Sequence, residues 1–225
     1  MKNLAIIPAR GGSTRLKNKN IFPLIGEPLI RWITKSVIAT GLFDKVIIST
    51  DNENIYQAVS DLQVIYHNRS KLLATTKSTV LETILSILDN TEEKFDTIGY
   101  FLPTCPFIKP DSIAKGIEIL SVKDVDSVVS VTEYTETVQL ACKLHNGQLL
   151  PQFSNLQEGN TNSKYLDKYY RPTGGFYIGM WEHIKLSRNF FIGNVHGVNL
   201  GYEESVDINY KEDIKFAESI YRKST

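Results

Sequence analysis

The sequence has little that marks a secreted, membrane-spanning or nucleic-acid-binding protein. Its two cysteines, Cys105 and Cys142, lack CxxC-type spacing, so we expect buried free thiols in a reducing compartment. No stretch approaches the roughly 20 apolar residues of a membrane span, and the run Leu4–Pro8 is too short for a signal peptide. The 25 basic and 25 acidic residues cancel, which leaves no overall field for nucleic acid or anionic lipid. We expect a cytoplasmic protein that binds neither nucleic acid nor membrane.

Residues 1–132 instead alternate short apolar runs with longer amphipathic segments. The apolar runs predict a buried strand at Leu4–Pro8 and further strands at Lys45–Thr50, Val64–Tyr66, Thr97–Leu102 and Ser127–Val131. The amphipathic segments predict helices from Pro28 to Gly41 and at Glu53–Ser60, Thr79–Leu88 and Ser112–Leu120. This alternation indicates an α/β fold of three layers, with helices on both faces of a mostly parallel sheet.

The pattern changes in residues 133–170. Asn146 and Gly147 separate two apolar runs, Leu140–Leu144 and Gln148–Leu150, and an Asn-Gly pair in this setting predicts a β-hairpin. We therefore interpret residues 1–225 as a single domain in which residues 133–170 form an inserted arm, either a lid or a dimer contact. The parallel pattern is expected to resume afterwards, with strands at Gly175–Met180 and Asn194–Leu200 and a last helix at Lys211–Tyr221.

The segment Ala9–Asn20 follows the first predicted strand and has the composition of a phosphate-binding loop. It holds four cations and the adjacent glycines Gly11 and Gly12. Glycines let backbone N–H groups approach phosphate oxygens, while Arg and Lys supply countercharge. The segment matches neither a Walker loop nor a GxGxxG turn. A solvated surface loop is the alternative, but ligands of such sheets bind beyond the carboxyl ends of the strands, where this loop lies.

Five short motifs, taken in order, resemble those of the acylneuraminate cytidylyltransferases. They are Ile6–Ser13 with Lys19 and Asn20, Gly41–Asp44 with Ser49–Asp51, Leu102–Pro106, Arg171–Ile178, and Glu204–Asn209. The resemblance runs the length of the chain. It implies a Rossmann-like nucleotidyltransferase fold, a homodimer, and an enzyme that uses CTP to activate an acidic sugar.

The resemblance also implies roles for individual residues on the CTP side. Arg10 and Lys19 would hold the triphosphate and act in catalysis together with Asp207. The full nucleotide-binding set is expected to be Ala9, Arg10, Gly11, Gly12, Ser13, Lys19, Asn20, Arg69, Ser78 and Thr79.

The metal site is expected at the segment Asp207–Asn209. The family typically carries Asp-x-Asp here, which binds Mg2+ that bridges the nucleotide phosphates. In this chain the second carboxylate is replaced by the amide of Asn209. Mg2+ takes hard oxygen ligands and few of them from protein, so Asp207 and Asn209 remain the expected metal ligands. Glu203 and Glu204 are close enough in sequence to supply the missing charge.

The acceptor side departs further from the family pattern. The resemblance implies sugar contacts at Thr104, Tyr170, Arg171 and Gly174. However, Leu102 stands where the family has glutamine and Ile108 where it has arginine, while Thr14 replaces a lysine of the phosphate loop, with Arg15 adjacent as a substitute. Family arginines of the arm that reach the partner's sugar carboxylate have no clean match, and Lys164 or Lys168 would have to take their place.

The function expected from these features is transfer of the cytidylyl group of CTP to a nonulosonic, sialic-acid-like sugar, with release of pyrophosphate. Two alternatives stay open. One is a nucleotidyltransferase with a different acceptor, such as a sugar phosphate or another acid. The other is a non-catalytic nucleotide-binding homologue that has lost the second metal carboxylate.

Overall fold

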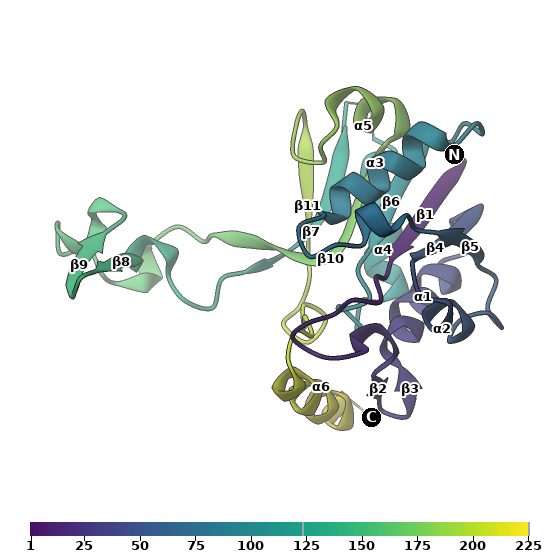
Figure 1. The fold of residues 1–225 in the computed structure, drawn as a ribbon. Helices are drawn as coiled ribbons and strands as arrows, with labels where there is room; N and C mark the ends of the chain where they lie inside the picture. Colours follow the sequence, from purple (N-terminus) through teal and green to yellow (C-terminus); the bar gives the residue numbers. More distant parts are fainter. Residues whose placement is uncertain (123, 225) are drawn as a thin grey trace.

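A seven-stranded sheet forms the centre of the protein, in the strand order β11-β7-β10-β6-β1-β4-β5 (Figure 1). A computed structural model describes residues 1–122 and 124–224. The sheet strands are β1 (Asn3–Pro8), β4 (Lys45–Thr50), β5 (Ile65–Asn68), β6 (Thr97–Phe101), β7 (Ser127–Glu133), β10 (Tyr170–Met180) and β11 (Val195–Asn199). The helices are α1 (Leu29–Ala39), α2 (Glu53–Gln57), α3 (Val80–Asn90), α4 (Pro110–Leu120), α5 (Trp181–Ser187) and α6 (Lys211–Ser224).

Local signals in the sequence account for several of these elements. All six residues of β1 are buried, as expected for a central strand covered on both faces. Helix α3 begins with a capping box, in which the Thr79 hydroxyl accepts from the Glu82 N–H while the Glu82 carboxylate accepts from the Thr79 N–H. Pro110 opens α4, a position where its missing N–H costs no helical hydrogen bond.

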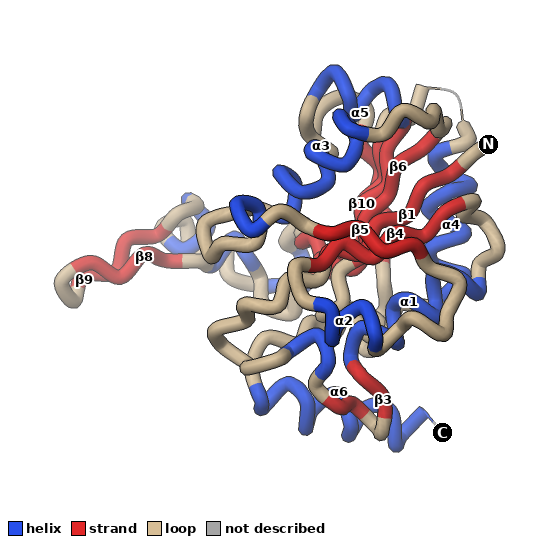
Figure 2. The backbone as a smooth tube through the Cα atoms, turned by 45° about the vertical axis from the view of Figure 1, so that its right-hand side comes forward, coloured by secondary structure: helices blue, strands red, loops and turns tan. Residues whose placement is uncertain are grey.

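Two hydrophobic clusters place helices on opposite faces of the sheet, which confirms the three-layer prediction. One cluster joins α1, α2 and α4 to the sheet and is centred on side chains such as Ile33, Ile48 and Phe176. The other joins α3 and α5 to the opposite face through Ile84, Ile98 and Trp181. Figure 2 shows α3 and α5 on one side of the strands and α1 and α2 on the other.

Strand β10 corrects one detail of the predicted sheet. Four of the neighbouring strand pairs are parallel (β1–β4, β1–β6, β4–β5 and β7–β11), but β10 runs antiparallel to both β6 and β7. The parallel pattern therefore does not resume with Gly175–Met180. The physical reason is that the arm leaves β7 and returns directly into β10, so the chain reverses as it does in a long hairpin.

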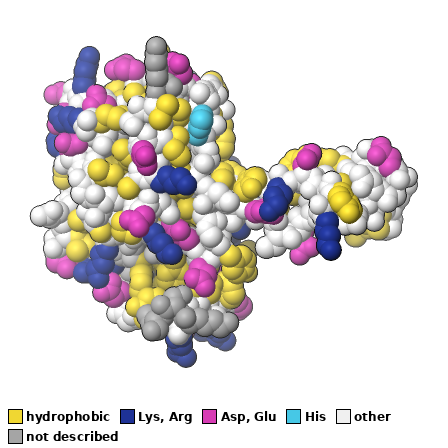
Figure 3. All heavy atoms as spheres, turned by 180° about the vertical axis from the view of Figure 1, so that it is seen from behind, with side chains coloured by type: hydrophobic (Ala, Val, Ile, Leu, Met, Phe, Trp, Pro, Cys, Tyr) yellow, Lys and Arg dark blue, Asp and Glu magenta, His cyan; other side chains and the backbone are white. Residues whose placement is uncertain are grey.

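The arm projects from the base of β7 and β10 and ends in a hairpin of β8 (Cys142–His145) and β9 (Gln148–Pro151) (Figure 1). Asn146 and Gly147 connect these strands with φ of 49° and 81°, the positive values that a type I′ turn requires. The predicted hairpin is thus confirmed, but Cys142 at its start is exposed and not buried as expected, because the arm stands outside the core. Seen from behind, the arm stands clear of the main body and shows hydrophobic side chains on its surface (Figure 3).

Helix α6 closes the other end of the molecule, beside the short strands β2 (Pro23–Leu24) and β3 (Glu27–Pro28) (Figure 1). Its residues Ile214, Ala217 and Ile220 pack in a third cluster with Leu24 and Leu29. This packing fixes the residues that precede α6, which include the expected metal segment. No helix within the described residues has the length and apolar character needed to cross a bilayer.

Candidate active site

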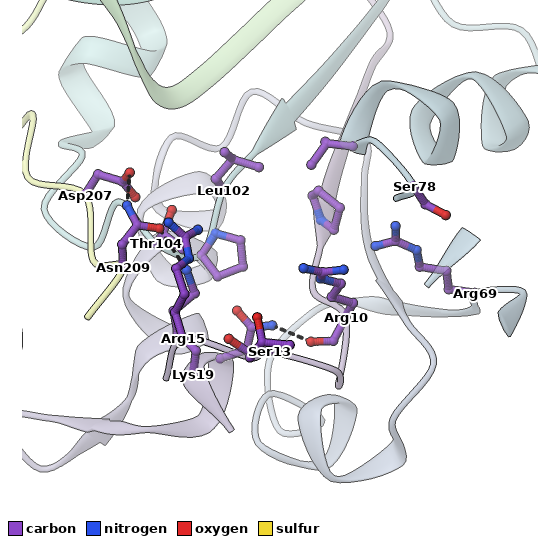
Figure 4. Close-up of a pocket in the computed structure, with 15 residues that line it drawn as sticks. Arg10, Ser13, Arg15, Lys19, Arg69, Ser78, Leu102, Thr104, Asp207 and Asn209 are labelled. Atoms are coloured by element: carbon purple, nitrogen blue, oxygen red, sulfur yellow. Dashed lines mark hydrogen bonds between the residues drawn. The ribbon is translucent and has the colours of Figure 1, made fainter. Parts of the chain in front are cut away.

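A cavity of about 350 Å³ lies at the carboxyl ends of β1, β5 and β6 (Figure 4). Four of its lining side chains are cationic and one is a carboxylate. The lining residues are Pro8, Arg10, Ser13, Thr14, Arg15, Lys19, Asn20, Arg69, Ser78, Val80, Leu102, Pro103, Thr104, Asp207 and Asn209. An excess of positive charge at this edge of a parallel sheet suits a phosphate-bearing ligand.

The loop after β1 is fixed by hydrogen bonds to the protein rather than left open. The Gly11 N–H donates to Oδ1 of Asp51 at 2.8 Å, and the amide of Asn20 donates to the carbonyl of Arg10 at 2.9 Å. A Cβ on Gly11 would lie 2.9 Å from Cβ of Asn52, so glycine is needed there for close approach. In this structure the Gly11 N–H is therefore held by Asp51 and stabilises the turn.

Two arginines lie in one half of the cavity and bind the segment that precedes α3. The Arg10 guanidinium donates to the Thr75 carbonyl at 2.6 Å. Arg69 donates to the Leu73 carbonyl, and although its side chain is only 4% exposed, its Nε has no hydrogen-bond partner among the described residues. A buried N–H without a partner costs free energy, which a ligand oxygen would recover.

Ser78 lies beside these arginines (Figure 4). Its hydroxyl donates to the Leu72 carbonyl at 2.9 Å and lies 2.8 Å from the Thr75 hydroxyl. In this structure the Ser78 hydroxyl therefore holds the same segment that the arginines bind.

The other half of the cavity holds Lys19, Asp207 and Asn209 in one network. The Lys19 ammonium donates to the Ile208 carbonyl at 3.0 Å and lies 3.4 Å from Oδ1 of Asn209. The Asn209 amide donates to Oδ2 of Asp207 at 2.6 Å. Burial lowers the pKa of Lys19, and the charge of Asp207 acts in the opposite direction. The Ile208 N–H also donates to the Thr104 carbonyl at 2.8 Å, which joins this segment to the end of β6.

The structure brings together most of the predicted site residues but not all of them. Those that line the cavity are Arg10, Ser13, Lys19, Asn20, Arg69, Ser78, Thr104, Asp207 and Asn209. Those that do not are Ala9, Gly11, Gly12, Thr79, Tyr170, Arg171 and Gly174. Thr79 caps α3, while Tyr170 and Arg171 are exposed at the base of the arm.

Glu203 and Glu204, considered as replacements for the missing metal carboxylate, and Ile108, which stands in place of a family arginine, all lie outside the cavity. The carboxylate of Glu204 accepts from the Lys109 N–H at the start of α4, and both Glu203 and Glu204 line a different cavity. Neither carboxylate lines the cavity that contains Asp207, and that of Glu204 is engaged at the N-terminus of α4. Ile108 is 1% exposed in the hydrophobic core and does not line the cavity.

Sequence reasoning did not assign a role to several side chains that line the cavity. One wall has an apolar surface, formed by Pro8, Val80, Leu102 and Pro103. Arg15, which the sequence offered as a substitute for the family lysine at Thr14, reaches the half of the cavity that contains Asp207 (Figure 4). The position of Leu102 and Pro103 directly after β6 was a usable signal, since residues at the carboxyl ends of parallel strands converge. Nothing in the sequence indicated that Val80, at the start of α3, would reach the same cavity.

Comparisons with known proteins find relatives that match nearly the whole chain. The chain is 28% identical to the pseudaminic acid cytidylyltransferase of Campylobacter jejuni, over 99% of this chain and 97% of that protein. It is 30% identical to the CMP-N,N'-diacetyllegionaminic acid synthase of Legionella pneumophila, over 98% of this chain and 96% of that protein.

A third relative, the N-acylneuraminate cytidylyltransferase of Escherichia coli, is 28% identical over 99% of this chain but 52% of that longer protein.

Solved structures show the same fold at lower identity. A CMP:2-keto-3-deoxy-manno-octonic acid synthetase complexed with CTP superposes with a TM-score of 0.71 at 14% identity, over all of both chains. A 4-diphosphocytidyl-2C-methyl-D-erythritol synthase from Anaerococcus prevotii superposes with a TM-score of 0.74 at 16% identity, over 98% and 96%. A model of the cytidylyltransferase family matches residues 4–164. The chain is therefore a nucleotidyltransferase that belongs to the cytidylyltransferase family.

Proposed function

We propose that this protein transfers the cytidylyl group of CTP to the anomeric hydroxyl of a nonulosonic acid sugar. The oxygen of that hydroxyl forms a bond to the α-phosphorus and loses its proton to solvent water, the bond from the α-phosphorus to the oxygen that bridges it to the β-phosphorus breaks, and pyrophosphate leaves. The observation that carries the proposal is the cavity itself, where four cations and Asp207 converge at the carboxyl ends of β1, β5 and β6. The names of the relatives support an acidic sugar as acceptor.

The residues that line the cavity suggest a division of labour between nucleoside and phosphate contacts. Arg69 and Ser78 lie together on one side, where they would contact the nucleoside (Figure 4). Arg10 and Lys19 would neutralise the phosphates, because phosphoryl transfer depends more on alignment and charge compensation than on covalent help from the protein. No histidine is among the residues that line the cavity, which favours this mode over a histidine base.

Magnesium is the metal that the donor set fits. Asp207 offers one carboxylate, and no group of three or more His, Cys, Asp or Glu side chains in the described part of the chain is arranged to hold a metal alone. Mg2+ is commonly bound by one or two carboxylates together with substrate phosphates and water. We therefore propose that Asp207 holds Mg2+ together with the triphosphate, where the ion would offset phosphate charge. Asn209, whose oxygen faces Lys19, would orient the carboxylate of Asp207.

The arm supports a further proposal, that the protein is a homodimer. Leu144 and Leu149 are paired across the two strands of the hairpin, with 72% and 66% of their surfaces exposed. Tyr165, further along the arm, is 82% exposed. An exposed apolar surface on a projecting element commonly marks a protein contact, and a second copy of the chain offers a matching apolar surface.

Pyrophosphate release tests the proposed reaction. The protein is incubated with CTP, Mg2+ and a panel of nonulosonic acids, and separately with sugar phosphates. Turnover with at least one acid is expected, and Arg10→Ala should abolish it without changing the circular dichroism spectrum. Turnover with sugar phosphates alone would favour the second candidate acceptor, for which the apolar wall at Leu102 is the motivating observation. Binding of CTP without turnover on any acceptor would favour a non-catalytic role.

A further inference from the structure

Arg15 differs from the other cations of the cavity in how it is held. Arg10, Lys19 and Arg69 each donate a hydrogen bond to a backbone carbonyl. Arg15 makes no hydrogen bond or ion pair with any residue in the ranges 1–122 and 124–224. Its guanidinium carbon instead lies 5.5 Å from the centroid of the Tyr210 ring. The ring contact is thus the interaction that holds this side chain at the cavity.

A ring contact leaves the donors of an arginine available. The five N–H groups of a guanidinium point outward in its plane, whereas an aromatic ring attracts the cation through the ring face. A carboxylate partner would instead occupy the same N–H edge that a phosphate needs. Tyr210 therefore restrains Arg15 without placing a carboxylate on the N–H edge that would bind an anion.

The backbone at Tyr210 is itself fixed by the first turn of α6. The N–H groups of Asn209 and Tyr210 both donate to Oδ2 of Asp213 at 2.7 Å. The phenol ring does not line the cavity, and Tyr210 is half-exposed outside it. Any effect of Tyr210 on a ligand in the cavity must therefore pass through a neighbour, and Arg15 is the cavity residue that its ring contacts.

We propose that Tyr210 is a positioning residue, which holds the guanidinium of Arg15 so that its N–H edge faces the triphosphate of the bound nucleotide. The inference rests on the proposed function, because it requires CTP in the cavity. It adds a contact between the segment that precedes α6 and the phosphate loop, and this contact complements the bond from Lys19 to the Ile208 carbonyl. Removing the ring would free Arg15 to sample other rotamers, and ordering it again on binding would weaken the affinity.

Calorimetric titration of CTP, in Mg2+ and low salt, tests the proposal on the wild type and two variants. Tyr210→Phe keeps the ring and is the matched control, whereas Tyr210→Leu keeps the bulk and removes the aromatic face. A cation–π contact at an exposed site is worth about 0.5–1 kcal/mol, so Tyr210→Leu should weaken CTP binding by about twofold to fivefold. Tyr210→Phe should stay within about 1.5-fold of the wild type, because the ring face that attracts the cation is retained.

The Arg15→Ala background distinguishes a positioning role from a general structural one. If Tyr210 acts through Arg15, Tyr210→Leu should have no further effect on CTP affinity once Arg15 is alanine. An equal loss of affinity in both backgrounds would overturn the proposal, as would wild-type affinity in Tyr210→Leu. Failure of the wild type to bind CTP is a separate outcome, which would overturn the proposed function and this inference with it.

Discussion

Asn209 stands at the point where the site has one carboxylate fewer than the family pattern, and restoring that charge has a calculable effect. In Asn209→Asp the amide that donates to Oδ2 of Asp207 at 2.6 Å is replaced by a second carboxylate. A hydrogen bond to a charged group, worth about 1.5–3 kcal/mol, is lost. Two carboxylates at about 4 Å repel by roughly 1 kcal/mol in water and roughly 4 kcal/mol near a protein surface. Attraction to Lys19, 3.4 Å from the Asn209 oxygen, offsets part of this.

We therefore expect Asn209→Asp to lower the free energy of unfolding by about 1–3 kcal/mol in EDTA, which is roughly 3–10 °C in Tm for a chain of this size. Mg2+ should reverse the loss, because two adjacent carboxylates form a better site for a hard cation and binding to the folded state stabilises it. The wild type should respond less to Mg2+ alone, since its site holds one carboxylate.

Thermal unfolding by circular dichroism, with and without millimolar Mg2+, measures both effects. Asn160→Asp on the arm is the matched control, because it adds the same charge at an exposed position far from the cavity. A Tm of Asn209→Asp equal to that of the wild type in EDTA would contradict the expected repulsion between the two carboxylates. A shift by Mg2+ no larger than that of the control would contradict the expected metal site.

Three further predictions concern other parts of the molecule. Gly174→Ala should destabilise the fold by about 1–3 kcal/mol in urea unfolding, because φ is 82° and the new Cβ would lie 3.3 Å from Cδ1 of Leu102; unchanged stability would argue against this backbone strain. The pKa of His67 should lie below 6.5, mainly because burial disfavours the charged ring. Protonation of His67 therefore favours the unfolded chain, so the free energy of unfolding is unaffected by this group above pH 6.5 and falls as the pH is lowered from 6.5 through the pKa of the folded protein. An NMR titration with a midpoint at or above 6.5 would contradict this. Replacing Leu144 and Leu149 together by glutamate should convert a dimer to a monomer in light scattering, whereas an unchanged mass would rule out the hairpin as the contact.

Much of the fold could be predicted because local patterns and tertiary packing agree. The strand Lys45–Thr50 has the predicted bounds, and β1 differs from its prediction by one residue. Asn146 and Gly147 identified the hairpin because the turn chemistry is local. The direction of β10 was not predictable in the same way, because an apolar strand has the same composition whichever way it runs, and only its pairing with β6 and β7 shows the reversal.

The site was predictable where motif residues converge and unpredictable where distant segments meet. The resemblance named Arg10, Lys19 and Asp207, and the structure places all three around one cavity. The bond from Arg10 to Thr75 joins positions 65 residues apart, and no sequence period encodes it. Glu204 was considered as a source of charge for the metal, but its capping of α4 depends on how residues 109 and 204 are brought together by the fold.

The rate of pyrophosphate release from CTP tests the proposed cytidylyl transfer. With Mg2+ and a panel of nonulosonic acids, we expect turnover with at least one acid and none when the acid is omitted. Arg10→Ala, which removes one of the cations that line the cavity, should abolish this turnover while the protein stays folded. Tight CTP binding with no pyrophosphate released on any acid, or full activity in Arg10→Ala, would contradict the account.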